Sequence, residues 1–473
     1  MKKFDSTIKL IKHKVLTEIA RGAFNDSLLT DLPDIPNKII NGRHPSYRCC
    51  IFKEKAIVAE RTKAAMGGNK SNPNVIEVID IACDGCPADG YHVSDTCRGC
   101  LSHNCLEVCP RNAIAIREDL TSYIDKKKCI NCGLCAKVCS FNAIVNFTPP
   151  CEAACKIDAI TREEDGISKI DNEKCVSCGA CMVKCPFGAI NDKSFILDVI
   201  GMLKKKEKVF AICAPSIAGQ FDYASMGQVI SGIKKLGFSD VLEVALGADM
   251  TADNESKELA QKKLLTSSCC PSFVLFVKKK HPKMVKHISH NLSPMGELAK
   301  HLKQKHKDAK VVFIGPCVSK KMEIQLPEVA KYVDSALTYE ELQALFESRD
   351  IDIETLEGED FSDASYFGRI FARSGGVSEA VKEALKEHQI DFDIKPAICS
   401  GLDECNKALL RVFANKDKVG SENFIEGMAC SGGCIGGAGN LHYSPKNKFL
   451  VEQHAAKASK NISEMINKAK ALE

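Results

Sequence analysis

Cysteine is the residue type in this sequence whose number and spacing indicate chemistry. The chain has 473 residues and 26 cysteines, and sixteen of these lie between residues 83 and 185. Six of the sixteen recur 46 positions later, in the pairs Cys105 and Cys151, Cys109 and Cys155, Cys129 and Cys175, Cys132 and Cys178, Cys135 and Cys181, and Cys139 and Cys185. The N-terminus lacks the apolar stretch of a signal peptide. This density therefore predicts metal or redox chemistry rather than disulfides.

The spacing within the repeat favours iron–sulfur clusters. Each unit has three cysteines at intervals of three residues, followed four positions later by Cys139 or Cys185. A [4Fe–4S] cube takes three thiolates from one tight loop and a fourth from a remote cysteine. Zinc is the alternative, but it typically takes two separated Cys-x2-Cys pairs. The segment resembles two tandem bacterial-ferredoxin units.

That resemblance implies how the thiolates are shared, because in ferredoxins the fourth cysteine of each run ligates the other cluster. Three cubes are predicted, with the ligands Cys97, Cys100, Cys105 and Cys139; Cys109, Cys129, Cys132 and Cys135; and Cys155, Cys175, Cys178 and Cys181.

The same rule assigns Cys151 and Cys185 to one further cube, which still lacks two of its four ligands. Positions 143 and 146, where the repeat would supply them, hold an alanine and an asparagine, which cannot ligate. The unassigned thiols nearby form a Cys-x2-Cys pair at 83 and 86. We therefore hypothesise a fourth cube with the ligands Cys83, Cys86, Cys151 and Cys185. The alternative is that Cys83 and Cys86 are structural and only three cubes form.

Three later segments carry further cysteines. The first, 266–271, has Cys269 and Cys270 at the start of an expected helix, with a proline at its first position. The second, 315–323, contains Gly-Pro-Cys, and the third, 426–439, has two cysteines among six glycines. Together they resemble the three signature segments of the [FeFe]-hydrogenase catalytic domain, over roughly residues 194–473.

The resemblance implies a cube joined to a two-iron centre with CO, cyanide and azadithiolate ligands. The matching ligands of the cube are Cys270, Cys317, Cys430 and Cys434, with Cys434 as the bridge. Cys269 matches the thiol that passes protons to the azadithiolate amine. The glycines would let the backbone approach a bulky cofactor closely.

The resemblance also implies a proton relay from Cys269 through Glu255, Ser289 and Glu258. The two glutamates lie three positions apart, so a helix would place them on one face. Lys320 matches a lysine that pairs with an iron-bound cyanide, and a buried ammonium needs an anionic partner. The remaining matches near the two-iron centre are Ala214, Pro215, Ser216 and Met428.

Three positions depart from the family pattern: Phe273 replaces a common tryptophan, Gly315 a methionine and Met295 a glutamine. They leave the ligands intact and suggest a divergent branch. The resemblance predicts a hydrogenase that interconverts protons and electrons with dihydrogen. The alternatives are a non-catalytic cluster-assembly protein of the prelamin-recognition-factor-like type and a hydrogen sensor. No role is assigned to Cys49 and Cys50, which we interpret as structural or reactive thiols, or to Cys213, Cys399 and Cys405, which we interpret as buried free cysteines.

The predicted fold is an α/β catalytic domain, preceded by tandem α+β ferredoxin-like domains and a helical segment. The expected boundaries are 1–75, 76–193 and 194–473. Apolar runs at 209–213, 241–244, 311–314 and 397–399 predict parallel strands buried on both faces. Ligands of such sheets bind beyond the carboxyl ends of the strands, where segments 214–216 and 315–317 lie.

Composition excludes some classes of partner. The net charge of +4 gives no indication of nucleic-acid binding, and no run of about 18 apolar residues predicts a membrane span. We expect a cytoplasmic protein. Its expected partners are a low-potential ferredoxin docked near the N-terminal clusters, and the maturation proteins that supply the two-iron centre.

Overall fold

The computed structural model describes residues 4–471 apart from 88, 164, 416, 417 and 419. The chain begins with the helices α1 (Thr7–Phe24), α2 (Leu28–Asp31), α3 (Ile35–Ile39) and α4 (Ile51–Ala65), so the helical start is as predicted. Ser6 caps α1 by accepting a hydrogen bond from the Lys9 amide at 3.3 Å. The apolar face of α1, with Leu16 and Ile19, packs into the core of the catalytic part against α16 (Tyr339–Ser348).

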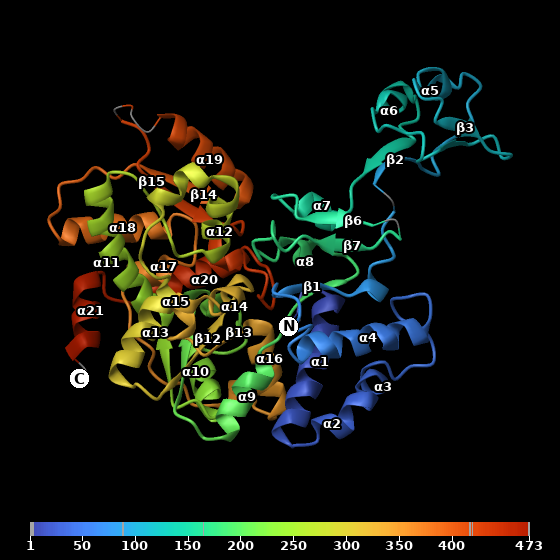
Figure 1. Ribbon diagram of the computed structural model, residues 1–473. Coiled ribbons are helices and arrows are strands. Elements are labelled where there is room, and N and C mark those ends of the chain that lie inside the picture. Colours follow the sequence, from blue (N-terminus) through green and yellow to red (C-terminus); the bar gives the residue numbers. More distant parts are fainter. Residues whose placement is uncertain (1–3, 88, 164, 416–417, 419, 472–473) are drawn as a thin grey trace.

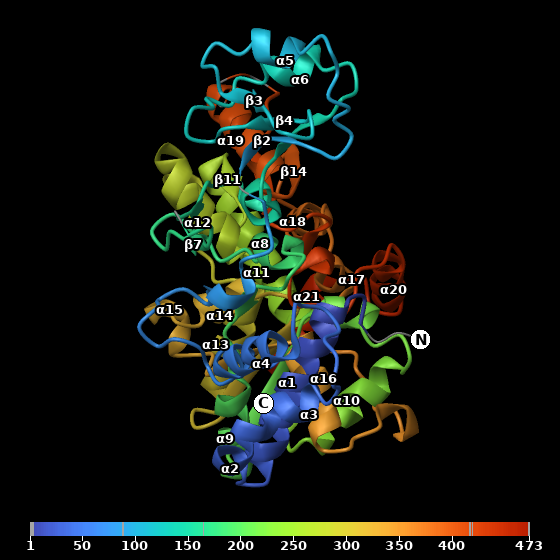
Figure 2. The same cartoon turned by 90° about the vertical axis from the view of Figure 1, so that its right-hand side faces the viewer.

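Two ferredoxin-like units follow, each with paired antiparallel strands around short helices (Figure 1). The outer unit, residues 90–147, contains β2 (Gly90–Val93), β3 (Ile114–Ile116), β4 (Ser122–Ile124), β5 (Ile144–Phe147), α5 (Asn104–Glu107) and α6 (Leu134–Val138). The inner unit, residues 76–86 and 148–192, contains β1 (Ile76–Val78), β6 (Ile160–Arg162), β7 (Ser168–Ile170), β8 (Ile190–Asp192), α7 (Pro150–Ala154) and α8 (Ala180–Lys184). Figure 2 shows the outer unit projecting from the rest of the molecule.

The inner unit is split in sequence by the outer one. Strand β1 pairs with β8, more than a hundred positions away, while β2 pairs with β5 and closes the outer unit. The chain therefore enters the inner unit, leaves it after Cys86 to build the outer unit, and returns at α7. This order explains why Cys83 and Cys86 stand outside the 46-residue repeat.

The catalytic part contains two parallel sheets. The first has the strand order β10 (Asp240–Glu243), β9 (Val209–Cys213), β12 (Lys310–Gly315) and β13 (Ser335–Thr338). The second has the order β11 (Leu265–Thr266), β15 (Phe424–Met428) and β14 (Pro396–Ser400). The predicted α/β fold with ferredoxin-like units before it is confirmed.

One part of the strand prediction is wrong. Strand β14 is an edge strand with α19 (Leu402–Asn415) against it, and Ile398 on its other face is 50% exposed. It is thus not buried on both faces, because none of the described elements covers its outer side. Strands β9 and β12 are buried almost throughout, as expected.

Helices surround the two sheets. They are α9 (Ile196–Lys204), α10 (Met226–Lys235), α11 (Val244–Lys262), α12 (Pro271–Lys280), α13 (Pro294–Lys305), α14 (Ser319–Glu323), α15 (Pro327–Ala330), α17 (Tyr366–Ile370), α18 (Gly376–Glu387), α20 (Lys446–Ala455) and α21 (Ile462–Ala471). Among the described residues, no helix combines the length and apolar character that crossing a bilayer requires.

Candidate catalytic cavity and cluster sites

A cavity lies where the carboxyl ends of both sheets meet. The chain leaves β9 into Pro215 and Ser216, β12 into Cys317, β11 into Cys269 and Cys270, and β15 into Cys430; all of these residues line one space. Its volume not filled by atoms is about 760 Å³, and its walls are mostly apolar. This is the position at which open α/β sheets bind ligands.

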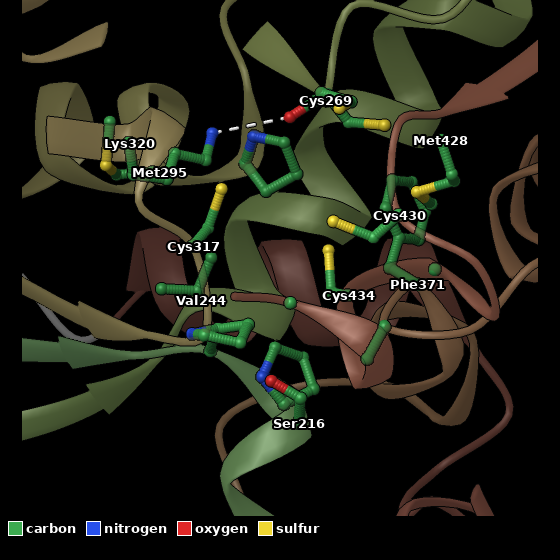
Figure 3. A pocket seen from close by; sticks show the side chains of 18 of the residues that line it. Ser216, Val244, Cys269, Met295, Cys317, Lys320, Phe371, Met428, Cys430 and Cys434 are labelled. Carbon is green, nitrogen blue, oxygen red and sulfur yellow. Dashed lines mark hydrogen bonds between the residues drawn. The ribbon is translucent and has the colours of Figure 1, made fainter. Parts of the chain in front are cut away.

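The predicted ligands of the catalytic cube all line this cavity. Figure 3 shows the sulfur atoms of Cys317, Cys430 and Cys434 pointing into a common space, and Cys270 lines the same wall. Burial raises the pKa of Cys317 to about 11 and that of Cys434 to about 12. Coordination deprotonates a thiol, so bound iron would have to supply the positive charge that keeps these buried sulfurs ionised. The donor set and the apolar chamber beside it fit a cube with a bulky group next to it.

Local structure places Cys269 and Cys270 as expected. Cys270 is the N-cap of α12 and Pro271 occupies the first turn. The pKa of Cys269 is raised well above its usual value, first by burial and then by Glu255. Cys269 therefore stays protonated near neutral pH, as a proton donor must.

Hydrogen bonds join the predicted relay residues in two places, Glu255 to Ser268, which precedes Cys269, and Ser289 to Glu258. Oε1 of Glu255 accepts hydrogen bonds from the Ser268 amide at 3.0 Å and from the Ser268 hydroxyl at 3.2 Å. Burial raises the pKa of Glu255 to about 7, against the hydrogen bonds from Ser268 and Ser289. Ser289 in turn donates to Oε2 of Glu258 at 3.0 Å. Glu258 lies at the surface end of the row, with Lys262 at 2.6 Å.

Lys320 lines the cavity, but its ion-pair partner in the structure is Glu323. Its ammonium lies 2.6 Å from a carboxylate oxygen of Glu323 and donates to the Cys269 carbonyl at 3.3 Å (Figure 3). The anion that a buried ammonium needs is therefore already present in the chain. Pairing of Lys320 with a cyanide stays a prediction that depends on its position at the cavity wall.

The cavity wall also contains the other predicted cofactor contacts, namely Ala214, Pro215, Ser216 and Met428. Ser216 is held by Tyr339, whose hydroxyl lies 2.7 Å from the serine hydroxyl and donates to the Ala214 carbonyl at 3.2 Å. Tyr339 was missed from the sequence because β13, which ends immediately before it, was not predicted.

The inner unit brings together Cys83, Cys86, Cys151 and Cys185, named here the inner set. The Ser168 amide donates to the Cys83 sulfur at 3.4 Å, and the Ser168 hydroxyl lies 3.5 Å from the Cys151 sulfur. Burial raises the pKa of Cys86, and the nearby thiols Cys185, Cys151 and Cys83 raise it further. These four thiols therefore lie within electrostatic reach of one another.

The outer unit repeats this arrangement. The Ser122 amide donates to the Cys97 sulfur at 3.5 Å, and the Ser122 hydroxyl lies 3.6 Å from the Cys105 sulfur. Ser122 and Ser168 are 46 positions apart, so Cys83 occupies the place that Cys97 occupies in the outer unit. Structure thus supplies the equivalence that the sequence repeat could not.

The remaining cysteine sets follow the predicted grouping. Cys109, Cys129, Cys132 and Cys135 line one small cavity in the outer unit. Cys155, Cys175, Cys178 and Cys181 are named here the proximal set. Burial raises the pKa of Cys181 most, and the other three thiols of the set raise it further, so the four lie near one another.

Backbone amides support these sulfur sites. An alanine amide donates to the fourth cysteine of each run, at 3.3 Å for Cys109, Cys139 and Cys185 and at 3.2 Å for Cys155. Such bonds stabilise thiolates and tune cluster potentials. In the described part of the chain, no three His, Cys, Asp or Glu side chains converge tightly enough to hold one ion. A cube spreads its thiolates over four irons and needs no such convergence.

The proximal set lies beside the catalytic cavity. Burial and the cysteines of its own set raise the pKa of Cys178, and Cys270 raises it further. Burial also raises the pKa of Cys430 most, and Cys178 is among the thiols that raise it further. Lys279 of α12 donates to the Cys175 carbonyl at 2.7 Å, which ties the two parts together. Electrons at the proximal set would thus be one step from the catalytic cube.

Comparison with known proteins identifies this arrangement. The family model described as "Iron only hydrogenase large subunit, C-terminal domain" matches residues 207–438, which include the cavity and its cysteines. Residues 207–438 are thus similar to the catalytic domain of iron-only hydrogenases. Models of a 4Fe-4S dicluster domain and a 4Fe-4S binding domain match residues 96–143 and 168–191.

Several relatives carry the hydrogenase domain. Iron hydrogenase 1 of Clostridium pasteurianum is 29% identical over 60% of this chain and 59% of that protein. The NADP-reducing hydrogenase subunit HndD of Solidesulfovibrio fructosivorans is 28% identical over 55% of each. The chain thus spans less than two thirds of the length of these relatives. A cytosolic Fe-S cluster assembly factor NAR1, from Meyerozyma guilliermondii, is 31% identical over 24% of this chain and 25% of that protein.

Solved structures are more distant. A variant of the [FeFe]-hydrogenase HydA1 of Chlamydomonas reinhardtii aligns with 55% of this chain and 88% of that chain, at 20% identity and a TM-score of 0.45.

Two departures from the hydrogenase pattern have a packing reason. A Cβ at Gly315 would lie 2.4 Å from the ring of Phe313, which itself lines the cavity. The phenylalanine thus occupies the space that a larger residue at 315 would need. The ring of Phe273 packs on Gly427, where a Cβ would lie 2.3 Å from it. Met295, the third departure, is fully buried in the cavity wall.

The cysteines without an assigned role differ in exposure. Cys213, Cys399 and Cys405 are buried free thiols, as predicted, whereas Cys49 is exposed and Cys50 half-buried. Cys399 donates to the Ala397 carbonyl and Cys405 to the Met428 carbonyl, each at 3.6 Å, and the neighbouring Cys399 and then burial raise the pKa of Cys405.

Proposed function

We propose that this chain is an [FeFe] hydrogenase, which interconverts protons and electrons with dihydrogen. The observation that carries the proposal is the single cavity lined by Cys270, Cys317, Cys430 and Cys434, with Cys269 at its wall and a row of carboxyls leading outward. When bound, the cube and two-iron centre supply the metal at which dihydrogen forms or splits. The chain supplies the thiolates, excludes water with apolar walls and carries protons.

Each protein group has a defined task in this proposal. Cys269 exchanges a proton with the cofactor from within a buried wall. Glu255, with its pKa near 7, takes up and releases that proton at neutral pH. Ser289 connects it to Glu258, which exchanges with solvent through the partly exposed end of the row.

The ferredoxin-like units carry electrons in this proposal. The outer unit receives them from a low-potential carrier, a ferredoxin, and the proximal set delivers them to the catalytic cube. We propose four accessory cubes, including one on the inner set, and the division into residues 1–75, 76–193 and 194–473. The cytoplasmic location and the dependence on maturation proteins are part of the same proposal.

Infrared spectroscopy of maturated protein tests the catalytic site. Bands of iron-bound CO and cyanide together with hydrogen evolution from reduced viologen would support the hydrogenase. A folded, cluster-loaded protein without those bands would point to the assembly-factor alternative. Bands without turnover would point to a hydrogen sensor.

Iron analysis tests the fourth accessory cube separately. The double substitution Cys83→Ser and Cys86→Ser should remove one cube's iron, while Cys49→Ser and Cys50→Ser should remove none. Unchanged iron content in the first variant would reject the fourth cube.

A further inference from the structure

Two arginines beside the inner set lack an acidic partner. Arg61, on α4, is 5% exposed and donates to the Asn191 side chain at 3.0 Å and to the Gly188 carbonyl at 2.8 Å. Both acceptors are neutral, and its Nε is buried without a hydrogen bond. Among the described residues, no carboxylate lies within ion-pair distance of Arg61.

A buried charge without a counter-charge is costly, so an anion is expected nearby. Glu340 acts on Arg61 electrostatically, but its carboxylate is already paired with Lys12 at 2.5 Å. Gly188 stands three residues after Cys185, in the loop whose Ala189 amide donates to the Cys185 sulfur. Burial lowers the pKa of Arg61, and the neighbours that oppose this shift are first Tyr47, then Cys185 and Glu340. Tyr47 is a phenol that is neutral at neutral pH, so a cube with Cys185 among its ligands would supply the anion that Arg61 lacks.

Arg162 repeats this arrangement on the other side. Its guanidinium donates to the Cys86 carbonyl at 3.1 Å and to the Pro87 carbonyl at 2.5 Å, and its Nε is also buried without a hydrogen bond. Within the described residues Arg162 forms no ion pair. The nearest acid that it influences is Glu152, whose pKa is raised by burial. Two guanidinium groups thus flank the inner set, one near Cys185 and one near Cys86.

The outer unit provides an internal comparison, because it holds an equivalent set of thiols without such charges. Ile116 stands 46 positions before Arg162, at the same end of the equivalent strand. The arginines of the outer unit, Arg98, Arg111 and Arg117, are all exposed. Water and salt screen exposed charges far more than buried ones.

We propose that Arg61 and Arg162 raise the reduction potential of a cube on the inner set above that of its outer counterpart on Cys97, Cys100, Cys105 and Cys139. Reduction adds one electron, from a one-electron carrier, and makes the cube more negative. Nearby cations stabilise that state, and here Arg61 is buried and Arg162 half-buried. Because dihydrogen needs two electrons and each cube takes one, the inner set holds the first electron beside the proximal set until a second arrives. The inference depends on the fourth accessory cube of the proposed function.

Redox titration followed by electron paramagnetic resonance tests the inference, in protein without the two-iron centre. Arg162→Ile gives the inner unit the residue that the outer unit already has. We expect it to lower the ratio of reduced to oxidised inner cube at fixed potential about tenfold, a one-electron shift of about 59 mV. Arg61→Gln should act in the same direction, and Arg61→Lys should retain most of the wild-type potential.

The reciprocal change is Ile116→Arg, which should raise the potential of the outer counterpart. It also keeps the test decisive if Arg61→Gln fails to fold. The inference is overturned if the inner cube forms but its potential is the same in wild type, Arg162→Ile and Arg61→Gln. Loss of the cube's signal in the Cys83→Ser and Cys86→Ser variant identifies it. A wild type without that signal would instead reject the fourth cube and leave the catalytic proposal intact.

Discussion

Glu255 offers the sharpest test of the proton path, because its two carboxylate oxygens have different surroundings. Oε1 accepts both hydrogen bonds from Ser268, whereas Oε2 has no hydrogen-bond partner among the described residues. In Glu255→Gln the amide oxygen can keep both Ser268 bonds. The substitution therefore removes the exchangeable proton with little change in packing.

The magnitude follows from the pKa. Burial raises the pKa of Glu255 from 4.5 to about 7. At pH 7 a carboxyl with a pKa of 4.5 is protonated in only about one molecule in 300, so taking up a proton costs about 3 kcal/mol. The shift of the pKa to about 7 removes that cost. Below pH 7 the protonated form of Glu255 dominates and above it the ionised form does, so relay is easiest where both are populated. Because proton transfer by a positioned group contributes about 10²–10⁴-fold, Glu255→Gln should lower turnover by a factor in that range.

Hydrogen evolution from reduced viologen, measured from pH 5 to 9, is the assay. Infrared bands of the two-iron centre and the resonance signals of the reduced cubes should match wild type, which separates proton transfer from assembly and electron transfer. Glu383→Gln, on the surface face of α18 with Lys386 at 3.0 Å, is the matched control and should leave turnover unchanged. If Glu255→Gln retained more than a tenth of wild-type turnover with intact cofactor signals, the row through Ser289 would not be the proton path.

Three further outcomes are expected. Lys321→Ala should destabilise the protein by about 3–5 kcal/mol, since it leaves the buried carboxylate of Glu341 without an ion pair and that of Asp192 with Lys12 alone. Thermal denaturation compared with the exposed Lys382→Ala measures this, and equal midpoints would contradict it. Gly179→Val should slow hydrogen evolution with ferredoxin about tenfold or more at constant iron content, because a Cβ there would lie 2.5 Å from Ala438 and force the proximal set from the cavity. Gly420→Val is the control, because Gly420 also has a positive φ but lies outside the ferredoxin-like units, and among the described residues a Cβ there would meet only the Lys395 ammonium, at 3.8 Å. Burial raises the pKa of Asp249 from 3.8 to about 7. The stabilisation linked to this shift, about 4 kcal/mol, is fully present below about pH 4 and is lost as the pH rises through 7. Asp249→Asn should therefore flatten the fall in denaturation temperature between pH 5 and pH 8.

The sequence allowed the fold class to be predicted, because local patterns determine it. Strand β9 was visible as an apolar run and α12 by its proline start, and both are formed as expected. The edge position of β14 could not be predicted, since a short apolar run does not show whether a second layer covers it. Burial on one face or two depends on the tertiary arrangement.

The candidate site was predictable where chemistry requires particular residue types. Cysteines with the spacing of cluster ligands are visible in the sequence, and the four predicted for the catalytic cube line one cavity. Groups that support them were not visible: Glu323 beside Lys320, Tyr339 beside Ser216 and Arg61 beside Cys185 have no motif. Tyr339 and Arg61 are more than a hundred positions from their partners, and a glutamate three residues after a lysine is common on solvated helices.

The nested order of the ferredoxin units explains why the N-terminal helices are buried in the catalytic core. The inner unit must lie against the hydrogenase domain to bring the proximal set to Cys270, and its last strand, β8, ends in Asp192. That carboxylate binds Lys12 of α1 at 2.6 Å and Lys321 of α14 at 2.8 Å. It thus joins β8 to α1 and α14, three elements from three parts of the chain. Lys321 is the next residue after Lys320, which lines the cavity, so a shift of the inner unit would displace part of the cavity wall. Buried ion pairs of this kind are poor sources of stability but tolerate little change in geometry. Their place here is therefore better explained by the need to hold a cluster at a fixed distance from the cavity than by the stability of the fold.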